Sequence, residues 1–180
     1  VCLRRKITSS MKRWDQYKIE LPKSRHEAEE FGKAKKGIVI CGECRAVYHK
    51  KAWHHSLEKL KMKDDRDYPL SFQMCPACKM IRDHQFEGEI KVIGYPAEIK
   101  KELTNLIRNF CKRAYERDPM DRLIEIKEDG NNLTVTTTEN QLAQKLAKKI
   151  REIFKRFKIK ISYSAEPGDT VYIEMKFLSL

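Results

Sequence analysis

Two pairs of cysteines carry the clearest chemistry in this sequence. Cys41 and Cys44 are separated by two residues, and Cys75 and Cys78 repeat that spacing after a gap of thirty residues. Two intervening residues allow a tight turn to direct both thiolates of a pair at one ion, and two such pairs complete the tetrahedral shell that Zn²⁺ prefers. The sequence therefore predicts one structural Zn²⁺ held by these four cysteines.

Two histidines leave an alternative ligand set open. His49 follows Cys44 by five positions and His84 follows Cys78 by six, so either could replace a cysteine or serve a catalytic zinc. Four cysteines already fill the shell and leave no position for water, which favours a closed structural site. The sequence has no phosphate-cradling glycine loop, nucleophile elbow or helical HExxH motif. We therefore expect a non-enzymatic protein.

The charge of the chain indicates a polyanionic partner. Of 180 residues, 36% are charged, and the formal net charge is +12. Residues 1–40 contain 11 Lys and Arg against 5 Asp and Glu, so residues 1–37 are expected to form a basic arm able to follow nucleic-acid phosphates. A basic protein without such a partner is the alternative. The sequence has neither a membrane-length apolar run nor a signal-peptide core, which predicts a cytoplasmic protein.

The elements that must position the cysteines form a small module over residues 38–88. A strand at 38–40 leads into the first pair, and Val47, Tyr48 and Trp53 are expected to cover the metal site with apolar surface. A short helix is predicted over 54–63. The chain then returns to the second pair, giving a zinc-ribbon-like module.

Residues 89–180 change to a regular alternation of strands and helices. Strands are predicted at 89–93, 123–127, 133–138, 159–163 and 171–177, with a helix from Pro96 that ends before Pro119. A second helix has the apolar stripe Leu142, Leu146, Ile150, Ile153 and Phe157. The resulting β-α-β-β-α-β-β order predicts an α+β fold with a ferredoxin-like antiparallel sheet and both helices on one face. Cys111 is expected to be a buried thiol of the first helix.

Two surfaces of this domain are basic enough to consider as binding sites. The open sheet face is expected to be a solvated mixture of charges, since it lacks the aromatic pair of nucleotide-stacking sheets. The second helix carries a stripe that is either an ordinary charged surface or an RNA-backbone contact, formed by Lys145, Lys148, Lys149, Arg151, Lys155 and Arg156.

The residues around the second cysteine pair resemble those of a known protein family. The run from Cys75 to Asp83, followed by Glu87-Gly88-Glu89-Ile90, resembles an uncharacterised bacterial family of short zinc-ribbon proteins. In that family a CxxC with a nearby Trp, matched here by Cys41, Cys44 and Trp53, precedes a CPxCxRIRD-like motif. This chain departs from the motif at Lys79-Met80, where an Arg is common.

Residues 75–177 are more distantly similar to the N-terminal region of the nuclear-export adaptor family of the large ribosomal subunit. In that family a zinc-binding region also leads into a strand that starts like Gly88-Glu89-Ile90, and residues 124–130, 143–146 and 161–163 match its strands and helix. The adaptor has two zinc sites, further domains and export signals. The resemblance therefore implies binding to the large ribosomal subunit rather than nuclear shuttling.

The resemblance and the charge together predict a ribosome-associated factor that binds ribosomal RNA, with assembly, quality control and dormancy as open roles. A zinc-stabilised protein-interaction adaptor is the alternative, and a catalytic zinc site ranks last. The expected RNA contacts are basic residues of the arm and of the segments around the cysteines: Arg4, Arg5, Lys6, Lys12, Arg13, Arg45, Lys50, Lys51 and Arg82.

Overall fold

The first of two sheets contains four short strands around the cysteines. A computed structural model of the protein describes residues 37–58, 69–165 and 169–178. The strand order is β3-β2-β1-β4, with β4 parallel to β1 and the other pairs antiparallel. The strands are β1 (Ile38–Ile40), β2 (Val47–His49), β3 (Ala52–His54) and β4 (Leu70–Phe72).

The predicted strand at 38–40 is confirmed as β1, whereas the helix predicted over 54–63 is wrong at its start. His54 is the last residue of β3, and its partner in β2 is Val47. A cross-strand pairing uses the backbone groups that a helix would need for itself. Residues 59–63 of that prediction, and the basic arm except for Gly37, lie outside the described residues.

The larger sheet follows a short helix, α2 (Pro76–Arg82), and has five strands in the order β6-β7-β5-β9-β8. Gly88, placed in the zinc module by the sequence prediction, is the first residue of β5. All five predicted strands of this region are present. They are β5 (Gly88–Ile93), β6 (Leu123–Asp129), β7 (Asn132–Thr137), β8 (Phe157–Tyr163) and β9 (Val171–Phe177).

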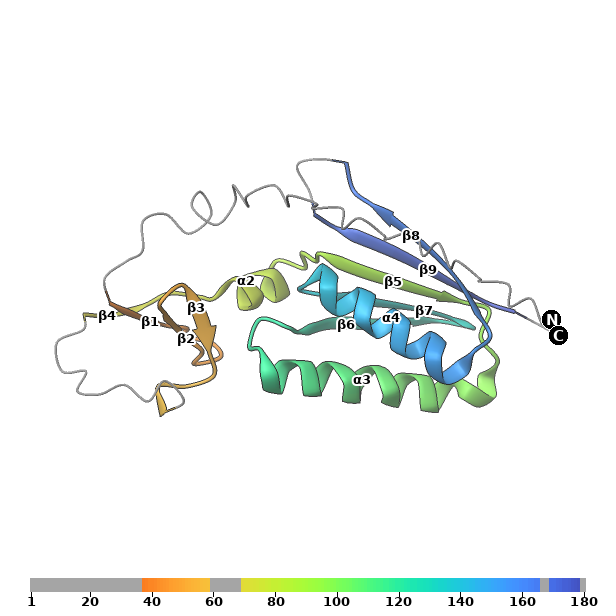
Figure 1. The fold of residues 1–180 in the computed structure, drawn as a ribbon, viewed down its shortest axis with the longest axis horizontal. Coiled ribbons are helices and arrows are strands. Elements are labelled where there is room, and N and C mark those ends of the chain that lie inside the picture. Colours follow the sequence, from red (N-terminus) through yellow and green to blue (C-terminus); the bar gives the residue numbers. More distant parts are fainter. Residues whose placement is uncertain (1–36, 59–68, 166–168, 179–180) are drawn as a thin grey trace, which may run out of the picture. The chain divides into compact units, whose positions relative to one another are not determined.

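Both long helices cover one face of this sheet, as predicted (Figure 1). A short 3-10 turn, η2 (Ala97–Ile99), leads into α3 (Lys100–Arg117), and α4 (Asn140–Phe154) lies between β7 and β8 in the chain. The first of the two ends before Pro119 as expected, because proline lacks the amide hydrogen that a helix requires. Among the described residues, no helix has the length and apolar character needed to cross a bilayer.

The core lies between the helices and that sheet face. Strand register places Ile90 beside Val135 and Ile173, all buried, and each belongs to the apolar cluster that includes side chains of the two helices. Leu142, Leu146 and Ile150 form the buried stripe of α4. The predicted stripe is too long at its C-terminal end. Ile153 is 42% exposed, and Phe157 belongs to β8 because the helix ends at Phe154.

The larger sheet is mixed rather than purely antiparallel, which corrects the sequence prediction. β9 lies between β5 and β8 and runs parallel to β5, so the fourth strand of the domain does not pair with the first as in a ferredoxin-like sheet. As a result, Val171, Ile173 and Met175 of β9 are buried beneath the helices, whereas Ile161 and Tyr163 of β8 are exposed at the edge. Both strands carry apolar side chains at alternate positions, so the local pattern does not decide which of them is central.

Candidate metal centre

The first cysteine pair lies in a tight turn that β1 and β2 hold in place. The amide of Cys41 donates to the carbonyl of Ala46 at 2.8 Å, and the amide of Arg45 donates to the carbonyl of Cys41 at 3.0 Å. Arg45 has a φ of 62°, the left-handed conformation that reverses the chain after Cys44. Two residues between the cysteines thus produce the turn that the spacing predicts.

The second pair uses the start of α2 instead of a turn between strands. Cys75 is the N-cap residue, Pro76 follows at the first helical position, and Cys78 lies in the first turn. The Cys75 sulfur accepts a hydrogen bond from the amide of Cys78 at 3.4 Å. The Cys41 sulfur accepts one from the amide of Cys75 at 3.3 Å, which links the two pairs. These bonds orient both sulfurs towards the other cysteines of the cluster.

The four sulfurs converge closely enough to hold one metal ion. All four Sγ atoms lie within 4.8 Å of one another, and those of Cys44 and Cys75 are 3.6 Å apart. Four ligands at about 2.3 Å in a tetrahedron would be separated by about 3.8 Å, so the donor set fits with a small contraction. Ala46, Ala77, Trp53 and Met120 enclose the cluster in apolar surface, and the expected covering role of Trp53 is confirmed.

The protonation of the cysteines shows why the cluster favours a cation. Burial raises the pKa of Cys75 above its usual range and raises the pKa of Cys78 to about 11. Burial also acts against ionisation of Cys41, but hydrogen bonds from the backbone of Cys44, Cys75 and Glu43 bring its pKa down to about 6. A divalent ion would supply the positive charge that lets all four sulfurs be thiolates.

Arg122 is the residue of this centre that sequence reasoning missed. It lies between α3 and β6, and its Nη1 donates to the sulfur of Cys78 at 3.5 Å. Its Nε donates to the carbonyl of Pro119 at 2.9 Å, and its guanidinium lies 4.8 Å from the centre of the Tyr115 ring. Four thiolates around a divalent ion would carry two negative charges in total, which this half-buried cation would partly neutralise. Nothing in the spacing of Arg122, 44 residues beyond Cys78, could have indicated the contact.

The two histidines considered as ligands are not part of the cluster. Among the described residues, the group with sulfur, nitrogen or carboxylate atoms close enough for an ion consists of the four cysteines. His49 is buried on β2, and His84 is exposed just beyond α2. Cys111 is separate from the centre, and burial raises the pKa of its thiol to about 12, as expected for a core cysteine.

The predicted RNA contacts near the cysteines are all on the surface. Arg45 is exposed on the first cysteine turn, and Lys50 and Lys51 form the exposed tip of the hairpin between β2 and β3. Arg82 is exposed at the end of α2, where it pairs with Asp83 at 2.7 Å. The remaining candidates lie in the arm, outside the described residues: Arg4, Arg5, Lys6, Lys12 and Arg13.

Comparisons with known proteins provide no relative for this chain. No protein-family model matches the sequence, and neither a curated protein nor a solved structure shows significant similarity to it.

Proposed function

We propose that the four cysteines bind one structural Zn²⁺. Four sulfur donors with no oxygen ligand favour a soft or borderline ion, and a tetrahedral arrangement of four thiolates is the usual shell of structural zinc. The apolar enclosure by Trp53 and Met120 supports this assignment, because a catalytic zinc needs a position open to water. The ion would join the β1–β2 turn to α2 and so stabilise the module.

We further propose that the protein is a non-enzymatic RNA-binding factor of the large ribosomal subunit. The RNA-binding part of this proposal rests on one observation, the two lysines at the tip of the β2–β3 hairpin. Lys50 and Lys51 are the two loop residues between paired His49 and Ala52, and both have positive φ angles, 48° and 67°. Such two-residue turns normally use Asn-Gly or a similar pair, since other residues are strained there. The turn therefore holds two cations in a conformation that is strained for lysine, and this strain is one that functional sites tolerate.

The neighbouring cysteine turn repeats this pattern. Arg45 also occupies the left-handed region, where glycine or asparagine would be less strained. All three cations are exposed on short, fixed turns, which would direct them at phosphates with little loss of side-chain and backbone freedom. The assignment to the large subunit rests on the similarity of residues 75–177 to the export-adaptor family.

The hairpin allows a test in which weaker RNA binding cannot be caused by misfolding. The double variant Lys50→Asn/Lys51→Gly installs a favourable turn, so the zinc-loaded protein should become more stable by about 1 kcal/mol. Its binding to purified large ribosomal subunits should nevertheless weaken. The slope of log affinity against log salt should decrease by about one unit for each phosphate that the variant no longer neutralises. Cosedimentation at several salt concentrations measures both effects.

The matched control removes two cations from the larger sheet, in the variant Lys158→Gln/Lys160→Gln. It has the same charge change and should bind subunits almost as the unaltered protein does. If the unaltered protein does not cosediment with large subunits, or if its binding is independent of salt, the proposed function is wrong. Equal weakening by both variants would show that total charge, and not the hairpin tip, drives binding.

One observation favours the alternative of a protein-interaction adaptor. Within residues 37–58, 69–165 and 169–178, β4 is an edge strand, and its Leu70 and Phe72 are 60% and 75% exposed on one face. Exposed apolar side chains on a sheet edge are suited to pairing with a strand of another protein. The variant Leu70→Ser/Phe72→Ser should leave subunit binding unchanged under the RNA proposal, whereas an adaptor would no longer bind its partner.

A further inference from the structure

The charge of the α+β domain is concentrated in its helices. Helix α3 contains six Lys and Arg against two Glu, and α4 contains four Lys and Arg against one Glu. The five strands of the sheet carry five basic and five acidic residues. The helices therefore hold a net charge of +7 while the sheet is neutral. The sequence prediction of a solvated, mixed-charge sheet face agrees with this division.

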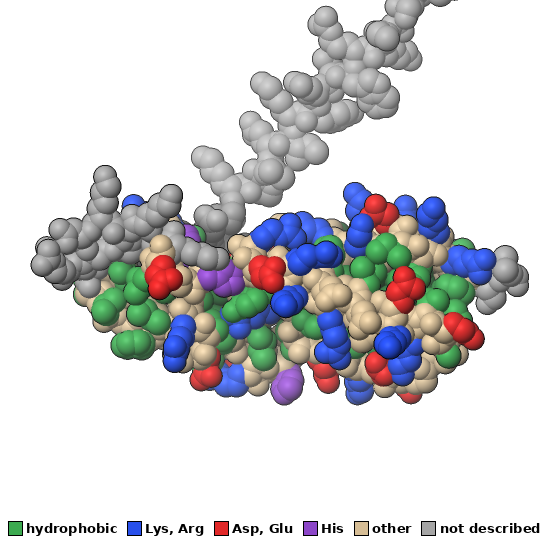
Figure 2. All heavy atoms as spheres, turned by 90° about the horizontal axis from the view of Figure 1, so that it is seen from below, with side chains coloured by type: hydrophobic (Ala, Val, Ile, Leu, Met, Phe, Trp, Pro, Cys, Tyr) green, Lys and Arg blue, Asp and Glu red, His purple; other side chains and the backbone are tan. Residues whose placement is uncertain are grey.

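Few of the helix cations are neutralised by neighbours. Within the described residues, only Lys100 and Lys149 of these ten side chains form an ion pair, with Glu128 and Glu152. Figure 2 looks onto the molecule from the side on which α3 lies, and Lys and Arg side chains are spread over its helical part. The exposed members of the set are Lys101, Arg108, Lys112, Arg113, Arg117, Lys145, Lys148 and Arg151.

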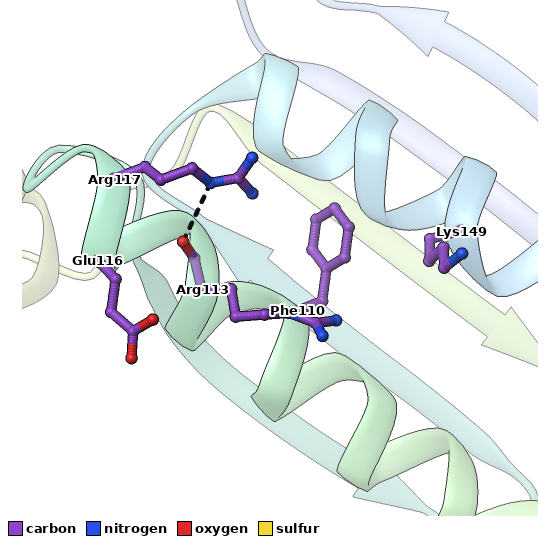
Figure 3. Close-up of a pocket in the computed structure, with 5 residues that line it drawn as sticks. All are labelled: Phe110, Arg113, Glu116, Arg117 and Lys149. Carbon is purple, nitrogen blue, oxygen red and sulfur yellow. Dashed lines mark hydrogen bonds between the residues drawn. The ribbon is translucent and has the colours of Figure 1, made fainter.

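An open groove lies within this basic surface. It has a volume of about 460 Å³ and is lined by Phe110, Arg113, Glu116, Arg117 and Lys149. Lys149 comes from α4, and the other four residues come from α3; the Phe110 ring extends from α3 towards α4 (Figure 3). The Nε of Arg117 donates to the carbonyl of Arg113 at 3.2 Å, which orients one guanidinium. Three cations, one carboxylate and one aromatic ring thus line a single hollow, which keeps a net positive charge.

We propose that the α3–α4 surface is an RNA-binding site, with the sugar–phosphate backbone lying across this groove. This inference rests on the proposed function. It adds a second RNA-contact region, and this region includes α3, a helix that the sequence did not single out. Arg113, Arg117 and Lys149 would each contact a phosphate, and the half-buried Phe110 ring would form an apolar wall beside a ribose. The excess positive charge, with so few ion pairs to offset it, is what a polyanion would neutralise.

The same surface is poorly suited to other partners. Among the large apolar side chains exposed in the described residues, only Ile153 belongs to these two helices. A helix that binds a membrane surface needs a broad apolar face, and a protein interface of useful affinity needs buried apolar anchors. A surface of dispersed cations with one open groove suits contacts to a phosphate backbone.

The test uses the full, zinc-loaded chain and a fluorescent RNA duplex of about 16 base pairs, the span of a typical duplex-binding domain. The groove variant is Arg113→Gln/Arg117→Gln/Lys149→Gln. The control, Lys127→Gln/Lys158→Gln/Lys160→Gln, removes equal charge from the neutral sheet. Between about 50 and 200 mM salt, the groove variant should bind about tenfold or more weakly than the unaltered chain, and its salt slope should fall by about two to three units. The control should stay within about twofold of the unaltered chain.

The outcomes separate this inference from the proposed function. If the hairpin variant weakens binding but the groove and sheet variants are equivalent, RNA binding stands and the groove site is wrong. If the unaltered chain binds no RNA, both are wrong. Tighter binding to a DNA duplex or to polyglutamate than to RNA would also overturn the groove assignment. Thermal unfolding of each variant checks that the substitutions leave the fold intact.

Discussion

At the scale of single residues, Arg122 connects the metal centre to the α+β domain. Its side chain reaches Cys78 and the Tyr115 ring, while its amide donates to the hydroxyl of Thr138 at 2.8 Å. That hydroxyl in turn donates to the carbonyl of Met120 at 2.6 Å, and Met120 packs on the cysteine cluster. One residue therefore combines a charge beside the thiolates with a backbone anchored in the domain.

Replacing Arg122 should weaken metal binding without removing a ligand. In Arg122→Gln the thiolates lose their nearby positive charge, and outer-shell changes of this kind typically lower metal affinity by about 10- to 100-fold. Competition with a zinc chelator at neutral pH measures the effect. Arg122→Lys keeps the charge and should have a smaller effect, while Arg113→Gln, exposed on α3, should have none. Unchanged affinity in Arg122→Gln would show that the contact is incidental.

At the scale of elements, β5, β7 and α4 pack so closely at Gly88 that a larger residue would clash there. Gly88 begins β5, and a Cβ there would meet the Thr137 hydroxyl and, at 2.5 Å, the Cβ of Ala143. Thr137 uses that hydroxyl to donate to the carbonyl of Glu139 at 2.9 Å, just before α4. The glycine is thus needed for close approach between a strand and a helix.

The variant Gly88→Ala should destabilise the protein through this overpacking. The free energy of unfolding should fall by about 1–3 kcal/mol, because neither Thr137 nor Ala143 can move without disturbing a strand or α4. Urea unfolding of the metal-loaded protein measures the change. Gly42→Ala is the control, since a Cβ at Gly42 meets nothing within 4 Å. Similar stability of the two variants would contradict the tight packing at Gly88.

At the scale of the whole molecule, the two sheets have different sources of stability. The larger sheet and its helices enclose a continuous apolar core, whereas the buried cluster around the cysteines consists of those side chains, two alanines and a few partly buried neighbours. Small modules with so little apolar area depend on metal binding for their folding. The α+β domain has its own continuous core, so we expect it to fold with or without the ion.

Removal of the metal should therefore unfold one part and spare the other. With chelator present, amide hydrogen exchange should become fast for β1, β2, β3 and α2, while β5, β7 and α4 stay protected. A Cys→Ser change at position 41, 44, 75 or 78 should have the same effect. Cys111→Ala, which leaves the cluster intact, is the comparison. Protection of the small sheet in chelator would refute the structural role of the metal, and loss of protection throughout would refute the independence of the domain.

The sequence by itself determined the cysteine cluster and the order of strands and helices in the α+β domain. Both are encoded over short distances: two residues between thiolates define a turn, and apolar periodicity defines a helix such as α3. The burial of Cys111 followed from the same periodicity. The helix predicted at residues 54–63 failed at its start because pairing of His54 with Val47 outweighed the local pattern.

Only the tertiary structure decided how distant segments meet. It placed β9 beside β5, brought Arg122 to a sulfur 44 residues away and aligned α3 with α4 so that their cations surround one groove. Each of these arrangements depends on how the whole chain buries its competing apolar surfaces. The left-handed lysines of the hairpin likewise follow from the pairing of β2 with β3, which leaves a two-residue loop that favours positive φ angles.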